Sequence, residues 1–120
     1  MIYGKLNSLA PFATQESWDN SGLLVGDPDA EVKTALVVLD ITAEAVREAR
    51  EIGAELIISH HPVIFHPLKK VESGSVVWEL AQAGISAICA HTNLDKARGG
   101  VNDCLAAALG LEHVTNYAVE

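Results

Sequence analysis

The stretch Leu56-Ile57-Ile58-Ser59-His60-His61-Pro62 decides how this chain folds. Its apolar run is short and rich in β-branched residues, which is typical of a buried parallel strand. Two histidines and a proline follow the strand directly. Ligands of open α/β sheets bind at the carboxyl ends of the strands, where this pair would lie. Neutral imidazole is the commonest metal ligand, so the stretch predicts a metal site; the alternative is a pair of capping or surface histidines in a loop.

The two histidines are adjacent in sequence, which restricts how they bind metal. Successive residues of a strand point to opposite faces. We therefore expect His60 and His61 to face apart unless the chain bends. Two ions about 3.5–4 Å apart would then take one histidine each.

Length and composition favour a single soluble domain over residues 1–120. The net charge of −8 argues against nucleic acid or an anionic membrane as a partner and suits a site that collects cations. No apolar run approaches the length of a membrane span, and we find no signal peptide. Cys89 and Cys104 lie in apolar surroundings, as small core residues do in a reducing compartment. We expect a cytoplasmic protein.

Apolar patterning alternates between strand and helix along the chain. Helices are predicted over residues 2–10, 43–52, 75–83 and 101–109, and strands over 23–26, 34–41, 55–59, 85–90 and the last ten residues. The apolar residues over 34–41 predict that this strand is buried. This order predicts an α/β fold with a mostly parallel sheet and helices on both faces.

Polar residues follow three of the predicted strands, and the topology gathers them at one sheet edge. Asp95 is the natural third ligand beside His60 and His61, because a carboxylate can bridge two divalent ions. His91 is either a ligand or a group that orients a ligand or a bound water. Asp40 is either a similar supporting group or a structural turn residue.

Five short motifs stand in order along the chain: Trp18-Asp19-Asn20-Ser21-Gly22-Leu23, Leu39-Asp40-Ile41-Thr42, residues 57–65, His91-Thr92-Asn93-Leu94-Asp95 and Gly99-Gly100-Val101-Asn102-Asp103. Together they resemble the Nif-three-like dinuclear metal proteins, the GTP cyclohydrolase I type 2 homologues, over essentially all 120 residues. In that resemblance His60, His61 and Asp95 match metal ligands, and His91 matches a site histidine.

The resemblance implies two divalent metal ions, which the ligand types do not narrow beyond Zn, Fe, Mn, Ni or Co. It also implies a homo-oligomer, the family's toroidal hexamer, and a metal-dependent hydrolase with a nucleotide or other small molecule as substrate. The alternative is a non-enzymatic metal-binding scaffold or regulatory interaction protein. Neither reading identifies a catalytic residue.

One departure from the family pattern concerns completeness. Family members are usually about twice as long and carry a C-terminal His-x-x-x-Glu on a helix, a motif that this sequence lacks. The chain looks like the N-terminal half of a longer member. We therefore expect weak metal binding, negligible hydrolysis by this chain alone, and an exposed apolar face or strand edge that drives association.

Overall fold

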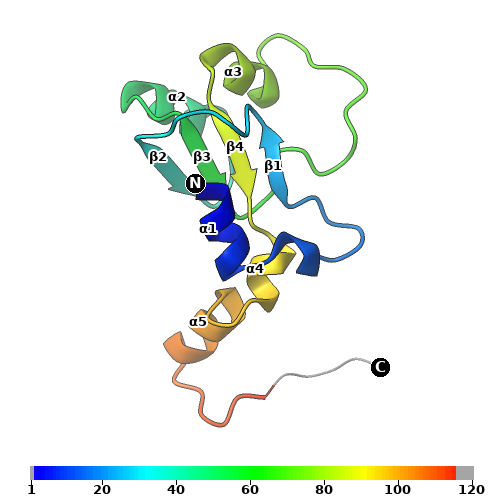
Figure 1. Cartoon of the computed structure of the whole chain (residues 1–120), viewed down its shortest axis with the longest axis vertical. Coiled ribbons are helices and arrows are strands. Elements are labelled where there is room, and N and C mark those ends of the chain that lie inside the picture. The colour runs from blue at the N-terminus through cyan, green and yellow to red at the C-terminus, as the bar shows by residue number, and fades with distance from the viewer. Residues whose placement is uncertain (1, 116–120) are drawn as a thin grey trace.

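A computed structural model describes residues 2–115 and shows one sheet with helices around it (Figure 1). The elements in chain order are α1 (Ile2–Leu9), the 3₁₀ helix η1 (Phe12–Thr14), β1 (Gly22–Val25), β2 (Ala35–Val38), α2 (Ala43–Glu51), β3 (Leu56–Ser59), α3 (Val76–Ala83), β4 (Ser86–Cys89), α4 (Thr92–Lys96) and α5 (Val101–Ala108). The sequence patterns predicted all of these except η1 and α4.

The sheet has four strands in the order β1-β4-β3-β2. β2, β3 and β4 are parallel, and β1 runs antiparallel to β4 at one edge. Parallel neighbours require a crossover connection, which α2 supplies between β2 and β3 and α3 supplies between β3 and β4. The predicted α/β class with a mostly parallel sheet is therefore confirmed.

The larger core lies between the sheet and the helices α2 and α3. Both helices begin at a hydroxyl cap: Thr42 Oγ1 accepts the Ala45 N–H at 3.2 Å, and Ser75 Oγ accepts the Trp78 N–H at 3.3 Å. α3 ends at Gly84, whose φ of 67° is left-handed and favours glycine. The buried side chains of this core are Ile41, Val46, Ala49, Ala54, Ile57, Leu80, Ile85 and Ala87.

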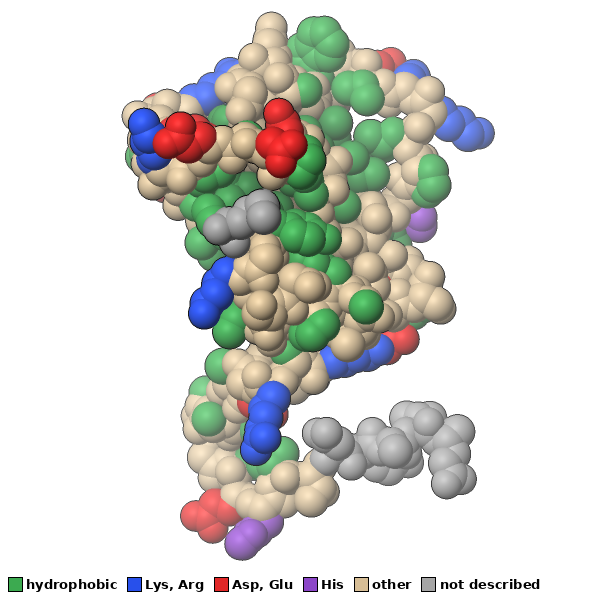
Figure 2. All heavy atoms as spheres, viewed as in Figure 1, with side chains coloured by type: hydrophobic (Ala, Val, Ile, Leu, Met, Phe, Trp, Pro, Cys, Tyr) green, Lys and Arg blue, Asp and Glu red, His purple; other side chains and the backbone are tan. Residues whose placement is uncertain are grey.

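The opposite face of the sheet is covered only in part. α1 and η1 pack there around Phe12, Leu56 and Ile88, with Tyr3 stacked on Phe12 at 4.6 Å between ring centroids. Figure 2 shows apolar side chains exposed on this side, over the sheet and around α1.

The strand predicted over 34–41 is shorter than expected and is not buried. β2 lies at the sheet edge, and its side chains alternate between half-buried and exposed, with Val37 73% exposed. Ala35 and Leu39, two residues to either side of Val37, are exposed as well. An unpaired apolar edge of this kind is a common site of association.

The C-terminal region also differs from the sequence expectation. α5 contacts α4 rather than the sheet, and its apolar stripe, Val101, Leu105 and the following Leu109, is exposed. Cys104 on this helix is exposed, so the prediction that it is a core residue is wrong, whereas Cys89 is buried as expected.

Residues 111–115 form no strand, and the rest of the predicted last strand lies outside the described residues. None of the helices in the described part of the chain is long and apolar enough to cross a membrane.

Candidate metal centre

The carboxyl ends of the parallel strands bring the predicted site residues together, on the side of the sheet where α4 lies (Figure 1). Asp40, His60 and His91 each come within two residues of the end of β2, β3 and β4 respectively. Backbone hydrogen bonds continue past the strand ends: the His60 and His61 N–H groups donate to carbonyl oxygens at and just after the end of β2, at 3.3 and 3.0 Å. The backbone that presents the histidines is therefore held on both sides.

Three imidazoles converge at this edge. His60 lies 5.2 Å from His61 and 5.1 Å from His91, and His61 lies 5.7 Å from His91, measured between ring centroids. One potential ligand atom from each ring lies within 4.8 Å of the others. β3 ends at Ser59 and the chain bends over both histidines, which is the exception to the expectation that His60 and His61 face apart. The Ser59 hydroxyl supports the bend by donating to the His61 carbonyl oxygen at 2.8 Å.

The Nδ1 atom of each imidazole has a fixed acceptor. His60 Nδ1 bonds the Ala90 carbonyl oxygen at 2.9 Å, His61 Nδ1 bonds Asp40 Oδ1 at 2.7 Å, and His91 Nδ1 bonds Asp19 Oδ1 at 2.9 Å. Carbonyl and carboxylate oxygens only accept, so each Nδ1 carries the hydrogen and each neutral ring keeps its lone pair on Nε2. Metal-binding histidines are commonly oriented in this way.

Asp95, on α4, lies next to His60. Its Oδ1 lies 3.5 Å from His60 Nε2. When His60 is neutral, this nitrogen and this oxygen are two acceptors that face each other without a proton between them. A cation between them would satisfy both atoms, so the residues present fit a divalent metal ion. Nothing else in the described residues approaches this geometry.

Asp19 was not predicted from the sequence as a site residue, although it lies in one of the motifs quoted above. Its side chain is 0% exposed. Burial alone would raise the pKa of this carboxyl, but hydrogen bonds from Thr92, His91 and Asn20 hold the pKa well below its usual range. Asp19 therefore stays ionised beside His91. No local sequence pattern could pair Asp19 with His91, because the two residues are 72 positions apart.

An exposed pair of aromatic side chains, Trp18 and Phe65, lies on the His91 side of the site. The Trp18 ring lies 6.5 Å from His91 and 6.1 Å from Phe65, edge to face in both pairs.

Behind the site, burial raises the pKa of the Cys89 thiol to about 12, and the nearby Asp19 charge adds to the effect. Cys89 is therefore a neutral thiol in the core, where it donates to the His60 carbonyl oxygen at 3.1 Å.

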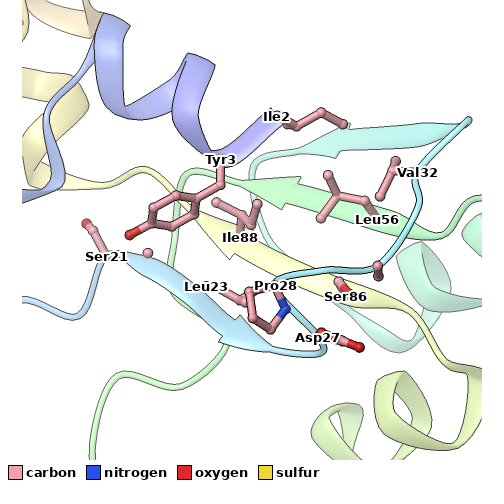
Figure 3. Close-up of a pocket in the computed structure, with 12 residues that line it drawn as sticks. Ile2, Tyr3, Ser21, Leu23, Asp27, Pro28, Val32, Leu56, Ser86 and Ile88 are labelled. Atoms are coloured by element: carbon pink, nitrogen blue, oxygen red, sulfur yellow. The ribbon is translucent and has the colours of Figure 1, made fainter.

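A separate hollow of about 550 Å³ lies on the α1 side of the sheet (Figure 3). Its walls are mainly apolar, and the Tyr3 hydroxyl points toward Ser21 at one end. None of the histidines lines it. The metal-binding geometry is thus confined to the strand ends.

Comparisons with known proteins agree with this arrangement of motifs. The sequence matches the Duf34/NIF3 (NGG1p interacting factor 3) family over residues 1–120. It is 47% identical over 113 residues to the GTP cyclohydrolase 1 type 2 homolog of Staphylococcus aureus (strain COL), which covers 92% of this chain and 31% of that protein. The chain thus spans about a third of the length of the curated relatives it matches.

Solved structures show the same fold. The crystal structure of Staphylococcus aureus hypothetical protein SA1388 superposes with a TM-score of 0.88 at 44% identity, over 93% of this chain and 38% of that one. A Bacillus cereus protein related to NIF3 gives a TM-score of 0.88 at 40% identity, over 93% of this chain and 32% of that one. With the family match extending over residues 1–120, this chain belongs to the Duf34/NIF3 (NGG1p interacting factor 3) family.

Proposed function

We propose that this chain binds divalent metal ions through His60, His61, His91 and Asp95 and forms part of the centre of a metal-dependent hydrolase. The observation that supports the proposal is the convergence of three imidazoles whose Nδ1 atoms are already bonded and whose Nε2 lone pairs remain available. His91 is included as a ligand because its ring lies as close to His60 as His61 does.

The proposed centre holds two ions, as the family resemblance implies, and imidazole with carboxylate donors suits Zn, Fe, Mn, Ni or Co. Bound metal would lower the pKa of a water and polarise a carbonyl, ring carbon or phosphoryl group. The chain's own residues orient the ligands: Asp40 and the Ala90 carbonyl fix the rings of His61 and His60.

Four donors are about enough for one tetrahedral ion and too few for two. Water would occupy the other positions, so we expect weak metal binding and negligible hydrolysis by this chain alone. A nucleotide or other small molecule as substrate, a toroidal homo-oligomer and a cytoplasmic location remain parts of the proposal.

A second candidate function is a non-enzymatic metal-binding scaffold or regulatory interaction protein. The exposed apolar stripe of α5, Val101, Leu105 and Leu109, favours it, because an apolar helix face without a partner suits protein binding. Metal-dependent turnover of a panel of nucleotides and phosphodiesters distinguishes the two candidates. Metal binding without turnover, in this chain and in a longer relative, would favour the scaffold.

Elemental analysis and zinc or manganese titration of the purified chain test the metal site. His60→Ala, His61→Ala and Asp95→Ala should each lower bound metal, because each removes one donor. His66→Ala is the matched control, since His66 is exposed in the loop after the site. Unchanged metal content in all three site variants would refute the assignment.

A further inference from the structure

We propose that Asp19 is a positioning residue of the metal centre, whose buried carboxylate sets the orientation of His91 and anchors the start of α4, which carries Asp95. The inference rests on the proposed function. It assigns Asp19 no contact with metal or substrate.

The Asp19 carboxylate is fully occupied by hydrogen-bond donors. Oδ1 accepts the Asn20 N–H at 2.8 Å and His91 Nδ1–H at 2.9 Å. Oδ2 accepts the Thr92 N–H at 3.0 Å, the Ser21 hydroxyl at 3.2 Å and the Thr92 hydroxyl. All five partners donate, so the site requires a group that only accepts, and an ionised carboxylate is such a group.

The first consequence concerns His91. Its Nδ1–H is directed at Asp19, so its Nε2 lone pair is the one available on the side of His60 and His61. The backbone N–H of His91 donates to Ser21 Oγ at 3.2 Å, and Ser21 itself donates to Asp19. Ring and backbone of His91 are therefore tied to the same carboxylate.

The second consequence concerns Asp95. α4 begins at Thr92 after His91, and His91 makes no side-chain capping bond. Asp19 provides the missing acceptor for the first N–H of the helix, from 73 positions earlier in the chain. Because α4 has only five residues, fixing its first residue also fixes Asp95. One buried side chain thus sets the relative positions of two proposed ligands.

Asp19→Asn is the informative variant, because it keeps the shape and replaces one acceptor oxygen by an NH₂ donor. The NH₂ group must face either His91 Nδ1–H or the Thr92 N–H. In the first arrangement His91 changes tautomer and its Nε2 carries a hydrogen; in the second α4 loses its anchor. Either result should weaken zinc binding about 10- to 100-fold, the usual effect of losing a group that orients a metal-binding histidine.

Two readouts on the metal-free and zinc-titrated chain test the proposal. ¹⁵N NMR of the imidazoles reports the tautomer of His91, and competition with a chromophoric chelator reports the zinc dissociation constant. Asp29→Asn is the matched control: it makes the same change at an exposed carboxylate in the loop between β1 and β2. It should keep the Nδ1–H tautomer of His91 and the wild-type zinc affinity.

The expected result is Nδ1–H on His91 in the wild type, with weakened zinc binding in Asp19→Asn and unchanged zinc binding in Asp29→Asn. A folded Asp19→Asn variant with wild-type zinc affinity would overturn the positioning role. If Asp19→Asn does not fold, the NMR spectrum of the wild type tests the proposal by itself. An Nε2–H tautomer of His91 in the wild type would overturn the positioning role as well. Failure of the wild type to bind zinc would instead overturn the proposed function.

Discussion

Replacing Thr92 by valine should destabilise the fold through a single hydroxyl group. Thr92 is buried, and its Oγ1 donates to the Asp19 carboxylate and accepts the Glu16 N–H at 2.9 Å. Valine has nearly the same shape, so packing changes little while both hydrogen bonds are lost. Thr92 thus joins α4 to the loop that precedes β1.

The two bonds set the expected magnitude. A hydrogen bond to a charged group contributes about 1.5–3 kcal/mol and a neutral one about 0.5–1.5 kcal/mol. Thr92→Val should therefore lower the free energy of unfolding by about 2–4 kcal/mol, measured by urea unfolding followed by circular dichroism with an unchanged m-value. Thr14→Val is the control, because the Thr14 hydroxyl is exposed and donates to the Pro11 carbonyl oxygen; it should cost less than about 0.5 kcal/mol. Equal and small losses in both variants would refute the reasoning.

Three further outcomes are expected. Leu80→Ala should cost about 2–5 kcal/mol in urea unfolding, because Leu80 is fully buried, whereas Leu105→Ala on exposed α5 should cost little; similar losses would contradict the packing described. In the native chain a maleimide should label Cys104 and not Cys89, whose thiol is buried and has a raised pKa; labelling of both at equal rates would contradict this. The pKa of Asp19 is lower in the folded chain than its ordinary value of 3.8, so its stabilising contribution is present above pH 3.8 and is lost as the pH falls further. The urea midpoint should therefore decrease between about pH 5 and pH 2, and it should decrease less steeply in Asp19→Asn. Parallel pH curves for the two proteins would contradict this role of Asp19.

Local sequence patterns were sufficient for the sheet and its crossover helices. The strand at Leu56–Ser59 is short and apolar, and the helix after Thr42 has a polar cap and an apolar stripe, so neighbours in sequence determine both. The apolar run in β2 could not show that this strand lies at an edge, because edge and centre differ only in what packs beside them. For the same reason the apolar stripe on α5 could not reveal that its side chains are exposed in the described part of the chain.

The histidines of the site and Asp40 could be placed at strand ends from the sequence, whereas Asp19 could not be assigned to the site. His60, His61 and His91 follow apolar runs, which placed them at strand ends. Asp19 reaches His91 only through the folded chain, and α4 is too short for its period to be read from the sequence. The bend after Ser59 was likewise invisible, since Ser59 holds it with a hydrogen bond to the His61 carbonyl oxygen.

Anomalous diffraction from zinc-soaked crystals of this chain tests the central claim most directly. The account predicts anomalous peaks for two ions at the carboxyl ends of β3 and β4, with the Nε2 atoms of His60, His61 and His91 about 2.0–2.1 Å from one ion or the other and an Asp95 oxygen nearby. Zinc bound through Nδ1 atoms, or only at the exposed His66 or His113, would contradict it.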